Sequence, residues 1–293
     1  MSIAFTKLHG NGNDFILIDE MNQVIIPDEM KAQFAVVYCD RRFGIGGDGV
    51  LFISKSDKAD IRMRLFQPDA SEAEMCGNGI RCLAKYAFDK EYVKKKAFAV
   101  ETLAGVMQVR VGYDNEGDFM ATIDMGAAAY QESCEIEGMT VYSVNTGVPH
   151  AVVFVGDVEG IDIDKVAPKI RHHPRFPKGT NVNFVQITGQ SEIVIRTFER
   201  GVEGETLSCG TGSTASALIA AKAGKVFGNP IHVKTAGGPL DITVGDIPQM
   251  TGPASTVFVG EIRYQPLFFE TAGPYLLQSK AATYGQMQHL YLT

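Results

Sequence analysis

The 293-residue chain contains no tryptophan, no long apolar segment and no excess of basic residues. Because no apolar run approaches the ~18 residues of a membrane-spanning helix, we expect no membrane partner. The 27 basic residues are spread along a chain of net charge −7, and this distribution disfavours nucleic acid as a partner. The first residues lack the basic and then apolar order of a signal peptide, so we expect a cytoplasmic protein.

Cysteine is scarce too, with five residues in the whole chain. An odd number of cysteines in a reducing compartment is typical of free thiols rather than of a disulfide framework. We interpret Cys39, Cys82 and Cys134 as small residues of the core. No pairs of cysteine and histidine have the spacing of a zinc site, so we expect no bound metal.

The other two cysteines, Cys76 and Cys209, lie in segments that are nearly alike, residues 75–79 (MCGNG) and 208–212 (SCGTG). In each segment the cysteine comes directly before a glycine-rich turn that leads into an apolar, alanine-containing stretch. A single buried cysteine is usually a core residue, but the repeated glycine context makes that a poor interpretation of this pair. Two equivalent thiols are what a two-base proton transfer needs, so the pair indicates an enzyme.

The repetition extends beyond the cysteines. Residues 42–44 (RFG) recur as 175–177 (RFP), and residues 51–53 (LFI) as 184–186 (FVQ), at the same separation of 133 positions that divides the cysteines (209 − 76). Such internal similarity indicates two copies of one unit, and two copies are too few for a solenoid. A chain of this length also suits about two domains of ~100–200 residues. We therefore predict two homologous domains that face each other across a cleft.

Each half carries short strand-like runs around one helical segment. The helical segments follow Cys76 and Cys209, and the second one, 210–223, has the composition of a buried helix. This pattern predicts an α/β (α+β) fold of two pseudo-symmetric domains, each a curled mixed β-sheet around a central helix. The last stretch, 265–293, has no counterpart in the first half. A core-covering tail, an oligomer contact and a non-native extension all stay open for it.

The two cysteines predict a specific chemistry if each one opens a helix. The positive end of a helix dipole stabilises a thiolate, so we expect this setting to lower the pKa of both thiols. One thiolate then acts as base while the opposing thiol acts as acid, and a stereocentre between Cys76 and Cys209 is inverted. A helix start also binds anions, so a substrate carboxylate has partners there. Its expected partners are the N–H groups of Gly77, Asn78, Gly210 and Thr211.

Three longer segments carry a resemblance to a known family. They are residues 10–15 (GNGNDF), 71–82 (SEAEMCGNGIRC) and 199–206 (ERGVEGET), the last followed by 209–212 (CGTG). In this order and spacing they closely resemble diaminopimelate epimerase, and the similarity covers roughly residues 3–263.

The resemblance implies a cofactor-independent isomerase, working without pyridoxal phosphate, that converts LL-2,6-diaminopimelate to the meso form in lysine biosynthesis. The expected partner is a small-molecule amino acid, with no cofactor, and a homodimer is one assembly that we expect. The family's C-terminal strand returns to the first domain. The expected domains are therefore residues 1–118 with 253–293, which hold Cys76, and residues 119–252, which hold Cys209.

The resemblance also implies roles for individual residues. It makes Cys76 and Cys209 the catalytic pair, and His150 a residue that steadies a catalytic loop or thiol. Glu199 and Arg200 match the pair that grips the distal, non-reacting end, where a carboxylate beside a guanidinium binds an ammonium and a carboxylate together. The other matched substrate-binding positions are Asn13, Gly77, Asn78, Asn181, Gly210 and Thr211.

Two positions depart from the family's pattern at the distal end. Gln67 stands where the family commonly has asparagine, and Val148 where it has a substrate-contacting asparagine. We keep Gln67 among the substrate-binding residues because glutamine retains the amide, whereas a valine side chain makes no hydrogen bond. A racemase of another amino acid, for example histidine, therefore stays open, as does a non-catalytic module that binds small anions. Glu199, Arg200 and Asn181 favour diaminopimelate.

Overall fold

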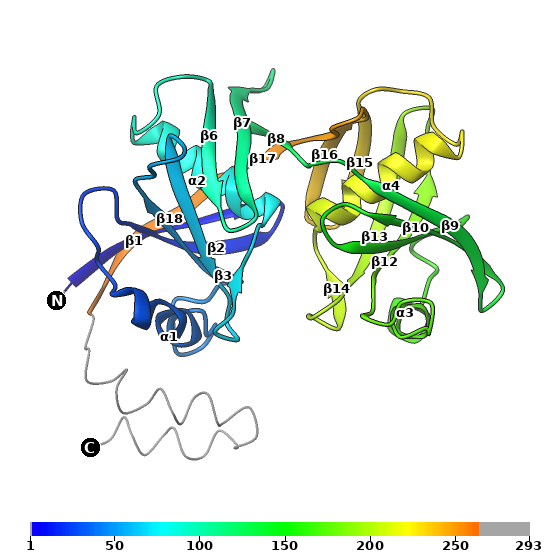
Figure 1. Cartoon of the computed structure of the whole chain (residues 1–293), viewed down its shortest axis with the longest axis horizontal. Coiled ribbons are helices and arrows are strands. Elements are labelled where there is room, and N and C mark those ends of the chain that lie inside the picture. Colours follow the sequence, from blue (N-terminus) through cyan, green and yellow to red (C-terminus); the bar gives the residue numbers. More distant parts are fainter. Residues whose placement is uncertain (1, 264–293) are drawn as a thin grey trace, which may run out of the picture.

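The computed structural model describes residues 2–263, and the C-terminal stretch from residue 265 lies outside the described residues. The chain forms two halves of similar construction that lie beside each other (Figure 1). No helix among residues 2–263 is long and apolar enough to span a membrane. The first half contains β1 (Ser2–Gly10), β2 (Asn13–Asp19), α1 (Asp28–Tyr38), β3 (Gly49–Ser54), β4 (Ile61–Phe66), β5 (Glu72–Ala73), α2 (Gly77–Asp89), β6 (Ala97–Thr102), β7 (Gly105–Tyr113), β8 (Phe119–Asp124) and β18 (Ser255–Arg263).

The second half repeats the order of elements found in the first. Its central helix, α4, follows the same succession of strands as α2 does. Its elements are β9 (Ala129–Ile136), β10 (Met139–Asn145), β11 (Pro149–Phe154), α3 (Ile163–Arg171), β12 (Asn181–Ile187), β13 (Glu192–Glu199), β14 (Gly204–Thr206), α4 (Gly210–Lys222), β15 (Ile231–Thr235), β16 (Gly238–Thr243) and β17 (Gln249–Pro253).

The strand pairings repeat as well. In the first half β1 pairs antiparallel with β2, β2 parallel with β3, and β4 parallel with β6. In the second half β10 pairs antiparallel with β11, β11 parallel with β12, and β13 parallel with β15. Parallel neighbours need a crossover connection, which the helices α1, α2, α3 and α4 provide in turn. The duplication in the sequence is therefore also a duplication of the hydrogen-bonded ladder.

The C-terminal strand of the described chain, β18, belongs to the first half. It pairs antiparallel with β1, just as β9 pairs antiparallel with β10 in the second half. The first half is thus completed by a strand that follows the whole second half. Residues 257–262 therefore lie in a strand that is hydrogen-bonded to β1.

The two halves are joined by β8 and β17, which pair antiparallel with each other. At this joint Thr122 lies opposite Thr251, and their hydroxyl oxygens are 2.8 Å apart. β8 also pairs with β7 and packs against α2, whereas β17 also pairs with β16. We therefore propose that the first half extends through Asp124, past the boundary at residue 118, and resumes near residue 253.

The strand β3 is buried on both faces, and the side-chain alternation shows why. In β3, Leu51 and Ile53 point to the cluster around α2, while Val50 and Phe52 point to a second cluster beneath α1. A third cluster lies beneath α3 in the second half. A strand that is covered on both faces has a continuous apolar sequence, and this explains the sequence of β3.

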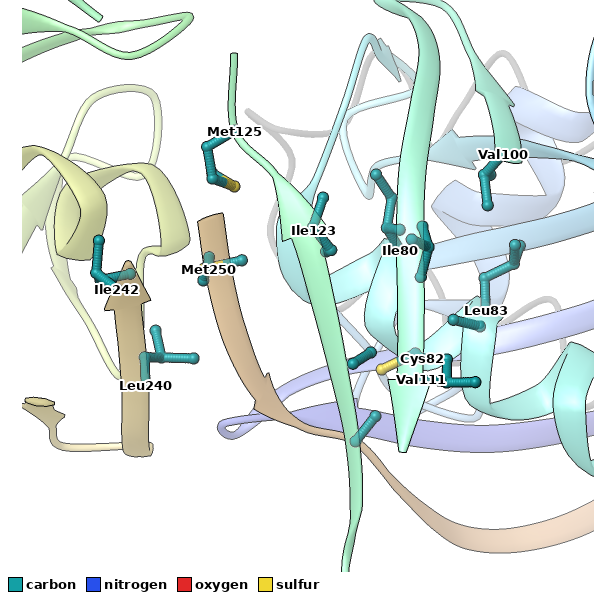
Figure 2. Close-up of a cluster of buried hydrophobic side chains, with 14 of the residues drawn as sticks. Ile80, Cys82, Leu83, Val100, Val111, Ile123, Met125, Leu240, Ile242 and Met250 are labelled. Atoms are coloured by element: carbon teal, nitrogen blue, oxygen red, sulfur yellow. The ribbon is translucent and has the colours of Figure 1, made fainter. Parts of the chain in front are cut away.

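The largest core cluster continues from one half into the other. It holds buried side chains of α2 and α4 together with those of the surrounding strands. Figure 2 shows Ile80 of α2 and Ile123 of β8 on one side, and Leu240 and Ile242 of β16 on the other, with Met250 of β17 between them. The predicted fold class, two duplicated halves that each curl a mixed sheet around a helix, is confirmed.

The outer layer of the first half supports a stability prediction. Phe34 of α1 is 0% exposed and packs edge-on against Phe52, with ring centroids 6.2 Å apart. Phe34→Ala should lower the free energy of unfolding by about 3–5 kcal/mol, because the cavity loses both apolar burial and contacts. Urea unfolding followed by circular dichroism measures this. Phe227→Ala, at a side chain 81% exposed, is the control and should change stability by less than about 0.5 kcal/mol; equal effects would contradict the assigned core.

Candidate active site

Cys76 is the N-cap residue of α2 and lies directly before its first residue, Gly77. Its backbone is extended, with φ −146° and ψ 114°, and the N–H of Gly79 donates to its Sγ at 3.4 Å. The thiol itself donates to Oδ1 of Asn13, which lies 3.7 Å away. The side chain of Asn78 donates to the same oxygen at 3.1 Å. The structure therefore brings three predicted site residues, Asn13, Cys76 and Asn78, into direct contact.

A charged cluster holds Asn13 in this position. Its Nδ2 donates to Asp48 at 2.7 Å, and Arg41 binds Asp48 at 2.8 Å and Asp14 at 2.6 Å. Lys7 also binds Asp14, at 2.6 Å. Burial alone would raise the pKa of Asp14, but hydrogen bonds from Arg41 and Lys7 lower it to about 2. The sequence gave no sign of this cluster, because its residues meet only in the folded chain.

Cys209 occupies the equivalent position before α4. Its backbone is extended too, with φ −117° and ψ 110°, and its Sγ lies 3.4 Å from Oγ1 of Thr211. The residue is only 7% exposed. A Cβ on Gly212 would come within 2.4 Å of Oδ1 of Asn183 and 3.4 Å of the Cys209 Sγ. Glycine at 212 is therefore required by the close approach of Asn183.

His150 lies against Asn183, the residue whose Oδ1 closely approaches Gly212. Its Nδ1 lies 3.1 Å from Nδ2 of Asn183, and Thr197 donates to Oδ1 of the same asparagine at 3.0 Å. Burial first, and the charge of Arg200 second, lower the pKa of His150 to about 3, so its ring is neutral at neutral pH. In the described residues no hydrogen bond joins His150 to Cys209. The sequence did not identify Asn183, which contacts His150 and lies beside Gly212, three residues after Cys209.

The starts of the two central helices meet at the junction of the halves. Nδ2 of Asn78 donates to the carbonyl of Ser208 at 3.3 Å, a contact between residues 130 positions apart. Met250 fills the space between the first residues of both helices: a Cβ on Gly77 would be 2.6 Å from its Cε, and one on Gly210 2.9 Å from its Sδ. Glycine at both positions lets the helix starts approach.

The predicted distal residues lie around β13. The Asn181 side chain accepts from the backbone N–H of Arg200 at 2.8 Å and donates to the carbonyl of Pro149 at 3.1 Å. Nη1 of Arg200 donates to the carbonyl of Lys178 at 3.4 Å. Burial raises the pKa of the Glu199 carboxyl, which favours its protonated form more than usual.

Gln67 and Val148, the two departures from the family's pattern, are not part of this hydrogen-bond network. Gln67 is exposed, and its Oε1 accepts a hydrogen bond from Ser71 at 2.9 Å. Val148 is partly exposed, and its carbonyl accepts from the N–H of Thr146 at 3.2 Å. In the part of the chain that the structure describes, neither side chain is hydrogen-bonded to Glu199 or Arg200.

The expected effect of the helix ends on the thiols is wrong. Burial raises the pKa of Cys76, and it raises that of Cys209 to about 12. The negative charge of Glu199 adds to the rise at both thiols. The N–H of Gly79 lowers the pKa of Cys76, and the hydroxyl of Thr211 lowers that of Cys209, yet neither outweighs burial. Desolvation therefore dominates the helix dipole, and the neutral thiols are favoured.

All five cysteines are free. Within residues 2–263, no group of three or more histidine, cysteine, aspartate or glutamate side chains is arranged to hold a metal ion. The polar groups that meet at the site are its two thiols, its amide side chains and the N–H groups of its helix starts.

A family model described as diaminopimelate epimerase matches residues 5–131 and 142–257. The chain is 52% identical over 273 residues to a curated diaminopimelate epimerase of Methanothrix thermoacetophila, covering 89% of this chain and 96% of that protein. It is 50% identical to one of Methanocella arvoryzae, with coverage of 89% and 96%.

Two solved structures share the fold at low sequence identity. A phenazine biosynthesis protein of the PhzF family from Bacillus anthracis matches with a TM-score of 0.73 and 15% identity, over 90% of this chain and 100% of that one. A hydroxyproline epimerase from Agrobacterium vitis matches with a TM-score of 0.66 and 18% identity, over 96% and 98%. These two similarities concern the fold alone.

The raised thiol pKa values predict a pH dependence. Because the pKa of Cys209 is raised to about 12, alkylation of this thiol by iodoacetamide in the folded protein should still increase about tenfold per pH unit between pH 8 and 10. Mass spectrometry of the labelled peptide measures the rate. The control is the same peptide in the unfolded chain, where the rate should level off near pH ~9. A plateau below pH ~10 in the folded protein would contradict the dominance of burial.

Proposed function

The chain belongs to the diaminopimelate epimerase family, and we propose that it interconverts LL- and meso-2,6-diaminopimelate at the junction between Cys76 and Cys209. It is an isomerase of lysine biosynthesis. The observation that carries the assignment of the site is the placement of one cysteine at the start of each duplicated central helix. The meeting of these two helix starts supports a single reacting centre shared by the two halves.

Inversion of a stereocentre needs a proton removed from one face and another added to the opposite face. We assign these steps to the two thiols, since they come from opposite halves of the molecule. A thiolate on one half takes the Cα proton, and the thiol on the other half gives its proton to the resulting carbanion. The substrate is then inverted, and the two cysteines have exchanged protonation states. No cofactor is required for this proton balance.

The negative charge that develops on the substrate needs stabilisation. We assign it to the helix starts, where backbone N–H groups lack intrahelical partners and attract a carboxylate. The short side chains at these positions let the substrate approach the backbone. The residues assigned to the reacting carboxylate are Gly77, Asn78, Gly210 and Thr211.

Thiols that are hard to ionise fit this reaction. A raised thiol pKa makes the thiolate scarce but strongly basic, and a carbon acid as weak as the substrate needs a strong base. Asn13 and Asn78 lie around the Cys76 thiol, while His150 and Asn183 contact each other near Cys209. We assign to these four side chains the task of keeping both sulfurs aimed at one carbon.

The distal end of the substrate is assigned to the second half. Glu199 and Arg200 offer a carboxylate and a guanidinium for the distal ammonium and carboxylate, and Asn181 fixes the backbone of Arg200. Gln67 supplies an amide from the first half, and Val148 supplies no polar group. The curated relatives, 40–52% identical over most of the chain, favour diaminopimelate over histidine.

The assembly and location of the protein stay predictions. A homodimer is supported by the exposed apolar side chains of β18, among them Val257 and Val259, which are 54% and 72% exposed. A cytoplasmic location is supported by the biosynthetic role of the relatives. A binding module without turnover, the other alternative, differs from an epimerase in an observable way.

Heavy water distinguishes an epimerase from a binding module. The unaltered protein should exchange deuterium into Cα of diaminopimelate while it converts the LL isomer to the meso form. Cys76→Ala and Cys209→Ala should each lower the rate of conversion by about 10²–10⁴-fold, because each removes one of the two proton-transfer groups. Mass spectrometry and chiral chromatography measure the two processes. Cys134→Ala is the matched control and should leave both rates unchanged; activity retained in the double variant would refute the two-thiol mechanism.

A panel of amino acids tests the distal assignment. We expect kcat/KM for diaminopimelate to exceed that for histidine by at least about tenfold, since only diaminopimelate presents charges to Glu199 and Arg200. Arg200→Met should raise KM for diaminopimelate while leaving the slow rate with histidine nearly unchanged. A higher kcat/KM for histidine in the unaltered protein would establish the alternative substrate instead.

A further inference from the structure

Among residues 2–263, Arg81 is the largest side chain that is completely buried. It lies in α2, five residues after Cys76 and directly before Cys82, and it is 0% exposed. Burying a guanidinium normally requires an ion pair, because the loss of hydration is costly. Among residues 2–263 no carboxylate forms an ion pair with Arg81. The fold therefore keeps a buried positive charge without a negative partner.

The hydrogen bonds of Arg81 all go to neutral acceptors. Nη2 donates to Oδ1 of Asn11 at 2.8 Å, and Nε donates to the carbonyl of Pro253 at 3.1 Å. Nη1 lies 3.8 Å from the Sδ of Met250. These bonds fix the planar group in one orientation but leave its charge uncompensated.

The same contacts tie Arg81 to the junction of the halves. Nδ2 of Asn11 donates to the carbonyl of Pro239 in β16, at 2.9 Å. Met250 packs between the starts of α2 and α4, against Gly77 and Gly210. The guanidinium is thus held by groups that also set the spacing of the two helix starts.

Burial lowers the pKa of Arg81 to about 10, and the negative forms of Cys82 and Cys76 raise it. The group is therefore still charged at neutral pH. Cys76 in turn is influenced by Glu199, which raises its pKa, and by Arg81, which lowers it. The sulfurs of Cys82 and Cys209 are further ionisable groups of this environment. Arg81 and Cys76 are five positions apart at the start of one helix, and Met250, whose Sδ lies 3.8 Å from Nη1 of Arg81, packs against Gly77, the residue directly after Cys76.

We propose that Arg81 is a positioning residue for the reaction, and that its unpaired positive charge offsets the negative charge that forms on Cys76 when this thiol acts as the base. The inference rests on the proposed function, because an uncompensated buried cation is explained by an anion that exists only during turnover. The positive charge is present before the thiolate forms, and hydrogen bonds to Asn11 and Pro253 fix the orientation of the guanidinium.

The test compares variants of Arg81 by the pH dependence of Cys76 alkylation. Arg81→Gln removes the charge and keeps a donor for Asn11 or Pro253, while Arg81→Lys keeps the charge. Lys85→Met is the matched control, because it removes one positive charge from the same helix at a partly exposed position. Iodoacetamide labelling of the Cys76 peptide from pH 7 to 10 is read by mass spectrometry, and kcat and KM are measured beside it.

We expect Arg81→Gln to shift the alkylation profile of Cys76 to higher pH, so that labelling at pH 8 slows by about tenfold, the effect of one pKa unit. Its kcat should fall by a similar factor or more, with KM little changed. Arg81→Lys should restore the profile, and Lys85→Met should match the unaltered protein. If Arg81→Gln does not fold, Arg81→Met replaces it, because an apolar side chain removes the cost of burying a charge.

An unchanged alkylation profile in the neutral variant would overturn the proposal, whatever happens to its thermal stability. A profile shifted equally by Arg81→Lys would also overturn it, because the charge would then not be the cause. Failure of the proposed function is read separately: if the unaltered protein exchanges no deuterium into diaminopimelate, the epimerase assignment fails, while labelling still shows whether Arg81 acts on Cys76.

Discussion

The close approach of two helix starts is the constraint on which the rest of the structure depends. α2 and α4 meet where Met250 touches the first residue of each and where Asn78 reaches the carbonyl before Cys209. Only glycine fits at Gly77 and Gly210 without displacing Met250. Each helix is also enclosed by strands, and a strand that an outer helix covers on its other face, such as β3 beneath α1, has an apolar sequence throughout. The duplicated architecture brings two N-terminal helix turns to one point.

That approach has an electrostatic consequence. Burial of the thiols at this junction raises the pKa of both, and hydrogen bonds from neighbouring groups offset only part of the rise. The proposed reaction uses the same property, because a base that is hard to form is a strong base. Asn13, which accepts a hydrogen bond from the Cys76 thiol, is held by Asp48, and Asn183, which lies beside Gly212 near Cys209, is held by Thr197. The two environments are similar in plan but differ in their side chains.

The order of the strands explains how one chain builds two such environments. β18 completes the first half as β9 completes the second, so the first half is closed only by the end of the described chain. β8 and β17, which hold equivalent places in the two halves, pair with each other and make the joint. Arg81 binds the carbonyl of Pro253 at this joint, across 172 positions of sequence. The spacing of the two cysteines is therefore secured by contacts from several distant segments.

The sequence by itself determined the duplication, the two cysteine turns and the fold class, because these depend on local patterns of glycine, apolar periodicity and repeated motifs. It also indicated Asn13, Asn78 and Asn181 through a family resemblance. Only the tertiary structure decided the direction of the thiol pKa shifts, which was predicted wrongly because helix geometry is local whereas burial depends on the whole fold. Three further features join residues far apart in the chain. They are the hydrogen bond from Asn13 to Asp48, the contact between Asn183 and His150, and the burial of Arg81 beside Asn11. A sequence pattern carries no information on the distance between residues far apart in the chain, and these features depend on such distances.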